Sequence, residues 1–142
     1  MKRAKMQPLT LKGRGIMEGT CTAEALVSTK PISFLGGIDS ANGKIIEKNH
    51  ELCGETIKNK ILVFPHGHGS TVGSYVIYSL AKKGVAPAAI INETADPVVA
   101  VGAIIAEIPM VDKIDIKQVR TGDTVKVDGL KGTVKILKHM EK

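Results

Sequence analysis

The sequence has few aromatic residues and few cysteines. Tryptophan is absent, and aromatic residues make up 3% of the chain. Because single-stranded nucleic-acid sites stack bases on aromatic rings, a site of that kind has little support here. Cys21 and Cys53 are too few for a disulfide scaffold and lack the paired spacing of metal ligands. Since an iron–sulfur cluster needs about three or four cysteines, we expect no cluster and no other metal on this chain.

Long apolar runs are also missing. No apolar stretch reaches the roughly 18 residues that suggest a membrane span. The start, Met1 to Met6, contains three cationic residues with no apolar segment after them, so no signal peptide is indicated. We therefore expect a cytoplasmic protein. A length of 142 residues with 43% hydrophobic content predicts one globular domain over residues 9–142, after a flexible basic tail over residues 1–8.

The net charge of +6 comes mostly from lysines that are scattered along the whole chain. There are only three arginines, and no basic cluster marks a nucleic-acid or membrane surface. A positive field suits an anionic small molecule or an acidic partner surface equally well. We therefore expect a small anionic ligand, and neither nucleic acid nor membrane.

The central stretch of the chain reads as a strand, a glycine-rich loop and a helix. Ile61–Phe64 is a short run of branched and aromatic residues that ends at Pro65, which is typical of a buried strand. From Val72 to Leu80, apolar residues recur every three or four positions and predict a helix with an apolar face of Val72, Tyr75, Val76 and Leu80. Ser70 is the expected N-cap of this helix.

The loop between this strand and helix is a candidate anion site. Its glycines let a ligand approach the backbone, and the free N–H groups of a helix start favour an anion. A P-loop needs a lysine before Ser70, where the chain has Gly69, and the glycine spacing is one residue too long for the dinucleotide fingerprint. Glu93, where a ribose-binding acid would lie, is only a weak match. An ordinary strand-to-helix turn remains an equally good interpretation of the loop alone.

The other elements add a second β layer to a parallel α/β core. The residues predict strands over 9–16, 20–28, 87–92 and 108–111, an extended segment over 30–35, a helix from Asp96 to Glu107 with Pro97 in its first turn, and a hairpin over 123–137. Residues 36–56 form a long polar excursion, with a turn at Asn42-Gly43. Asp39 in this excursion is either a functional residue or a turn residue bonding its own backbone.

Four groups of residues, in this order, resemble the small subunit of the aconitase X family: Gly36–Asp39, Pro65–Ser74, Pro87–Ile90 and Ala95–Ile104. The resemblance spans about Leu11 to Ile136, and the ordered set is more specific than any one motif. It implies a swivelling β/β/α domain like the mobile fourth domain of aconitase. Such a domain closes over a separate large subunit that carries a [4Fe–4S] cluster.

The archaeal branch of the family implies a hydro-lyase subunit that is active only with its large partner. Its reaction is the dehydration of (R)-5-phosphomevalonate to trans-anhydromevalonate 5-phosphate, in an archaeal-type mevalonate route to isoprenoids. Bacterial relatives suggest another hydroxy acid, such as hydroxyproline or an aconitate-like compound. A separate alternative is a stand-alone phosphate- or nucleotide-binding module that uses the glycine loop.

The resemblance assigns the role of proton acceptor to Ser70. A helix N-terminus stabilises an anion by up to ~2 kcal/mol, which lowers the pKa of a hydroxyl by only roughly 1.5 units. Activation must therefore come from converging backbone donors, a cation or dehydration on closure. Aconitase has an arginine near its equivalent serine, whereas this loop has only His66 and His68, so we expect activation from the partner.

Gly69, Thr71 and Ser74 are further candidates for holding substrate oxygens, together with Asp39. For Ser74, packing between helices is the competing explanation.

Overall fold

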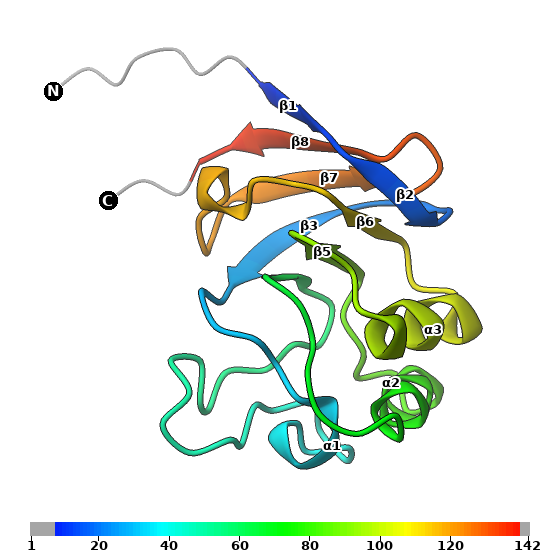
Figure 1. Ribbon diagram of the computed structural model, residues 1–142. Helices are drawn as coiled ribbons and strands as arrows, with labels where there is room; N and C mark the ends of the chain where they lie inside the picture. The colour runs from blue at the N-terminus through cyan, green and yellow to red at the C-terminus, as the bar shows by residue number, and fades with distance from the viewer. Residues whose placement is uncertain (1–7, 140–142) are drawn as a thin grey trace, which may run out of the picture.

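The computed structural model describes residues 8–139 (Figure 1). The basic tail predicted over residues 1–8 lies outside the described residues except for Pro8. In chain order the elements are β1 (Leu9–Lys12), β2 (Arg14–Met17), β3 (Thr20–Val27), α1 (Phe34–Gly37), β4 (Ile61–Phe64), α2 (Gly73–Lys82), β5 (Ala89–Asn92), α3 (Pro97–Ala106), β6 (Met110–Asp112), the 3-10 helix η1 (Ile116–Gln118), β7 (Thr124–Asp128) and β8 (Thr133–Lys138). Within 8–139, no helix is long and apolar enough to cross a membrane.

The strands form two β layers that share β3. The strand order is β1-β8-β7-β3-β4-β5-β6-β2. The half from β1 to β3 is antiparallel, whereas β3, β4, β5 and β6 are parallel neighbours. The first two strands lie at opposite ends of this order although only Gly13 separates them in sequence. The chain therefore passes from one layer to the other at Gly13.

Helices α2 and α3 pack side by side on one face of the parallel layer (Figure 1). Two cores result, one between the helices and this layer and one between the two β layers. Strand β4 shows the arrangement, since Leu62 and Phe64 belong to the helix-side core while Ile61 and Val63 belong to the other. Because both of its faces are buried, β4 is apolar throughout, as parallel strands commonly are. The predicted β/β/α architecture is confirmed.

Most predicted elements are present, with three differences. The single strand expected over residues 9–16 breaks at Gly13 into β1 and β2. The extended segment over 30–35 makes one bridge, between Ile32 and Gly67, before turning into α1. Residues 116–118, which lie outside the elements predicted from the sequence, form the 3-10 helix η1.

The apolar face predicted for α2 was assigned partly to the wrong residues. Val72 and Tyr75 are exposed, at 46% and 70% of their surface, whereas Ile77 and Leu80 are buried. On α3, similarly, the buried side includes Val99, while several aliphatic residues face outward. The reason is that α2 and α3 pack on each other through small residues, which a pattern of large apolar residues does not reveal.

Candidate functional site

The loop of residues 65–72 leaves the carboxyl end of β4 and leads into α2. Ser70 in this loop is exposed, and its Oγ accepts a hydrogen bond from the Val72 amide at 3.0 Å. Helix α2 begins only at Gly73, with Val72 as its N-cap and no side-chain cap. The expectation that Ser70 caps the helix directly was therefore wrong. Ser70 instead caps a tight turn that precedes the helix, since the Gly73 amide donates to the Ser70 carbonyl at 2.9 Å.

Three consecutive amides of the loop point to no acceptor. Within residues 8–139, the N–H groups of Gly69, Ser70 and Thr71 make no hydrogen bond. Gly69 has a φ of +100°, a backbone conformation that residues other than glycine rarely adopt. A Cβ at this position would lie 2.8 Å from Ser33 Oγ. Free amides on neighbouring residues are the arrangement by which backbone holds anionic oxygens.

The loop is held at two places. Its Gly67 amide donates to Asp96 Oδ1 at 2.7 Å, while Asp96 Oδ2 accepts from the Val99 amide at 3.2 Å and so caps α3. On the other side, Ile32 exchanges backbone hydrogen bonds with residues 66 and 68. The Asp-Pro pair predicted the cap of α3, but no signal in the sequence indicated its second partner, Gly67.

A second carboxylate secures the segment before α3. Asp112 Oδ2 accepts from the Ala95 amide at 2.8 Å, and the Arg14 guanidinium donates to both of its oxygens at 2.8 and 2.9 Å. Burial raises the pKa of Asp112, but the hydrogen bonds from Arg14 and Ala95 outweigh burial and hold this pKa below its usual range. Arg14 is thus engaged in the framework and not in the Ser70 loop.

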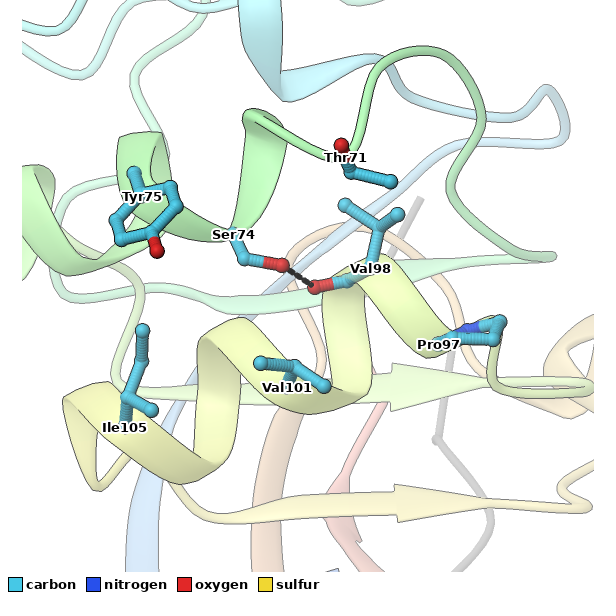
Figure 2. Close-up of a pocket in the computed structure, with 7 residues that line it drawn as sticks. All are labelled: Thr71, Ser74, Tyr75, Pro97, Val98, Val101 and Ile105. Carbon is cyan, nitrogen blue, oxygen red and sulfur yellow. Dashed lines mark hydrogen bonds between the residues drawn. The ribbon is translucent and has the colours of Figure 1, made fainter.

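Thr71 and Ser74 both line a pocket of about 410 Å³ between α2 and α3 (Figure 2). Ser74 Oγ donates to the Val98 carbonyl at 2.6 Å, and its side chain is buried. This contact supports the helix-packing explanation for Ser74. Thr71 is exposed next to Ser70, so its hydroxyl is accessible at the loop.

Asp39 lies in a turn of the excursion. Its Oδ1 accepts from the Ala41 amide at 2.8 Å, and its carbonyl accepts from the Gly43 amide. This is the turn geometry considered from the sequence, and no hydrogen bond in the described chain joins Asp39 to residues 69–74. Asp39 therefore positions its own turn in this structure.

The histidines and cysteines do not converge. His66 Nδ1 lies 2.8 Å from the Gly67 carbonyl oxygen, and both His66 and His68 are exposed. Cys21 is half-buried with its pKa raised by burial, and Cys53 is exposed. Across residues 8–139, no three His, Cys, Asp or Glu side chains are placed to hold a metal ion. These residues do not fit an iron–sulfur cluster.

Known proteins similar to this chain match more than nine-tenths of its length. A curated phosphomevalonate dehydratase small subunit of Methanosarcina acetivorans is 52% identical over 136 residues, which is 94% of either chain. The protein of the same name from Pyrococcus furiosus is 56% identical over 129 residues, covering 91% of this chain and 96% of its own.

Among solved structures, aconitase X of Thermococcus kodakaraensis in its holo-form superposes with a TM-score of 0.90 at 51% identity. The superposition covers 92% of this chain and 99% of the aconitase X chain. The family profile described as the aconitase X swivel domain matches residues 10–136. Together with the layered fold and the exposed serine loop, this match shows that the chain belongs to the aconitase X swivel domain family.

Proposed function

We propose that this chain is the small subunit of a hydro-lyase that removes water from (R)-5-phosphomevalonate in partnership with a large subunit. The names of the relatives, and their coverage of more than nine-tenths of both chains, support this assignment. The observation that carries it in the structure is the Ser70 loop, in which the Ser70 hydroxyl is exposed and three consecutive amides have no hydrogen-bond acceptor within residues 8–139. An active-site loop open to solvent suits a subunit whose substrate is held by another chain.

Ser70 accepts the proton in the proposed reaction. Removal of water from a 3-hydroxy acid breaks a C–H bond at the carbon next to the carboxylate and releases the 3-hydroxyl. A base must therefore lie close to the hydrogen that this carbon loses. The Val72 amide already donates to Ser70 Oγ at 3.0 Å and stabilises negative charge on it. Within the described chain, Ser70 Oγ donates no hydrogen bond to another protein group. Closure against the partner removes water from the loop and strengthens these interactions.

Gly69 and Thr71 bind substrate oxygens in this proposal. The two amides lie on either side of Ser70, and a carboxylate or phosphate oxygen placed against them gains charge-assisted hydrogen bonds. Any iron–sulfur cluster belongs to the large subunit, where it would assist departure of the substrate hydroxyl. Ser74 fixes α2 against α3, and Asp39 stabilises its own turn, through their hydrogen bonds.

The test combines this chain with the large subunit encoded in the same organism and measures formation of the anhydro acid. Ser70→Ala should lower kcat by about 10²–10⁴-fold, the usual contribution of a positioned base, while the heterodimer still forms. Ser79→Ala removes a hydroxyl from α2 away from the loop and should leave the rate unchanged. Full turnover by Ser70→Ala would exclude the proposed role of this serine. Hydroxyproline and aconitate, assayed beside phosphomevalonate, identify the substrate.

A further inference from the structure

The outward surface of α2 and α3 is apolar and nearly uncharged. Lys82 is the one charged residue among the twenty residues of the two helices, each of which is 10 residues long. Tyr75 is 70% exposed and Val101 49%, and two further aliphatic residues of α3, Ile104 and Ile105, are 47% and 43% exposed. The chain contains 20 Lys and Arg and 14 Asp and Glu residues, so its composition does not explain the lack of charge on these two helices. Contiguous apolar surface of this kind marks an interaction site.

This surface contains a groove with a defined shape. Its volume is about 410 Å³, and it is lined by Thr71, Ser74, Tyr75, Pro97, Val98, Val101 and Ile105. Figure 2 shows the aliphatic side chains of α3 on one side and Tyr75 on the other. The hydrogen bond between Ser74 Oγ and the Val98 carbonyl, 2.6 Å long, fixes the two helices against each other at one end of the groove. The groove is therefore preformed, and its occupant does not have to separate the helices.

The position of the groove identifies its occupant. Thr71 lines the groove and also follows Ser70 directly in the catalytic loop. A partner that brings substrate to Ser70 therefore comes within one residue of the groove. The relatives of this chain are named small subunits, which implies a larger partner. Interfaces of this kind bury aromatic and aliphatic anchors at their centre and exclude charge from it.

We propose that the α2–α3 groove is the docking site for the large subunit and takes an aliphatic or aromatic side chain from it. The inference rests on the proposed function for the existence of that subunit. The apolar contact holds the two chains together, while the adjacent Ser70 loop meets the substrate. Thr71 borders both regions, but the apolar groove residues that bind the partner are separate from Ser70 and Gly69.

The test measures the affinity of this chain for the large subunit by calorimetry or biolayer interferometry. Val101→Glu places a charge in the groove and should weaken binding by about 30-fold or more, the loss expected for an interface hot spot. Tyr75→Ala removes an exposed ring without adding charge and should weaken binding by at least about 5-fold. Leu130→Glu is the matched control, because Leu130 is 74% exposed in the turn after β7, outside the groove. Circular dichroism checks that each variant is folded.

Each outcome separates this inference from the proposed function. If folded Val101→Glu and Tyr75→Ala bind the large subunit as the wild type does, the docking site is wrong, whether or not the wild-type pair dehydrates phosphomevalonate. If they lose binding while Leu130→Glu keeps it, the docking site holds even when the wild-type pair proves inactive on that substrate. Sedimentation of the isolated chain tests a second copy as occupant. A homodimer that Val101→Glu dissociates, with unchanged binding of the large subunit, would overturn the inference.

Discussion

At the scale of single residues, Asp96 links the Ser70 loop to the rest of the domain. Its two carboxylate oxygens accept from the Gly67 and Val99 amides. Asp96→Ala leaves both donors unpaired, so we expect a loss of about 2–3 kcal/mol in the free energy of unfolding. Because the loop is then free to shift, kcat of the heterodimer should fall at least about 10-fold at a temperature where the variant is folded. Urea denaturation and steady-state kinetics measure the two effects.

Asp115→Ala provides the matched control for Asp96. Asp115 also caps a helix, since its carboxylate accepts from the Lys117 amide at the start of η1, but no hydrogen bond within residues 8–139 joins it to the Ser70 loop. Its replacement should cost about 0.5–1 kcal/mol and leave kcat unchanged. If Asp96→Ala loses stability but retains full kcat, Asp96 has a purely structural role.

Individual site residues could be predicted from the sequence where neighbouring residues form a recognisable local pattern. Ser70 was recognised because a strand, a glycine loop and a helix follow one another, and it is exposed as that pattern requires. The pattern placed the N-cap at Ser70, two residues before the observed N-cap Val72, because a tight turn precedes α2. The bond from Gly67 to Asp96 joins residues 29 positions apart and has no local signature.

At the scale of elements, Arg14 and Asp112 join β2 to β6 and to the start of α3. The pKa of Asp112 is lower in the folded chain than its ordinary value of about 3.9. The stabilisation is therefore fully present above that pH and is lost as pH falls through the lower folded value. Arg14→Gln should unfold at a lower urea concentration than wild type near neutral pH, and the difference should shrink below about pH 4.

Urea titrations of wild type and Arg14→Gln at several pH values measure this difference. Arg120→Gln removes a second exposed arginine whose side chain makes no recorded hydrogen bond or ion pair within the described residues, and it should follow the wild-type profile. A constant gap between Arg14→Gln and wild type through the acid range would mean that the Arg14–Asp112 pair does not cause the pH dependence.

The packing of α2 on α3 depends on a small residue. A Cβ on Gly102 would lie 2.6 Å from Ile77 Cδ1 and 3.0 Å from Ile77 Cβ, and Ile77 is fully buried. Gly102→Ala should therefore destabilise the domain by about 1–2 kcal/mol, because overpacking exceeds the gain in helix propensity. Urea unfolding measures this loss.

Ile77→Val supplies the diagnostic partner for Gly102→Ala. In wild type it removes a methyl group and should cost about 1 kcal/mol, but in the Gly102→Ala background it removes the clashing atom and should cost nothing or stabilise. Additive losses in the double variant would show that the contact between Gly102 and Ile77 does not limit the helix spacing.

Helices and strands were predicted better than the faces they bury. The Asp-Pro start of α3 and the alternation of β7 and β8 are strong local signals, and these elements appear as expected. The outward side of α2 was misread, because an apolar residue at helical spacing indicates contact but not whether the contact lies within the chain. Tyr75, taken from its spacing as a core residue, instead lines the α2–α3 groove.

At the scale of the whole molecule, the sequence predicted two β layers and a helical layer but not how the β layers are joined. The joint at Gly13 depends on contacts between segments far apart in sequence, such as β2 with β6 (Arg14 opposite Asp112) and β1 with β8 (Leu9 opposite Ile136). Hydrophobic periodicity carries no information about pairs of that separation. A strand that bends at one glycine reads in sequence as one strand, which explains why residues 9–16 were assigned to a single element.

Gly13 allows the two β layers to meet, and its replacement tests that closure. A Cβ there would overlap the Asp112 carbonyl oxygen, and the Gly13 amide donates to the Gly132 carbonyl at 2.7 Å. Backbone cannot yield as a flexible side chain can, so Gly13→Ala should cost about 3 kcal/mol or more. Hydrogen exchange should show faster exchange in β1 and β2 with β4 still protected, since the central strand keeps both neighbours.

Gly54→Ala, at a φ of +95° with open space around it, should cost only about 1 kcal/mol. Equal losses in the two variants, or unchanged exchange in β1, would show that the layers stay joined without the close approach at Gly13.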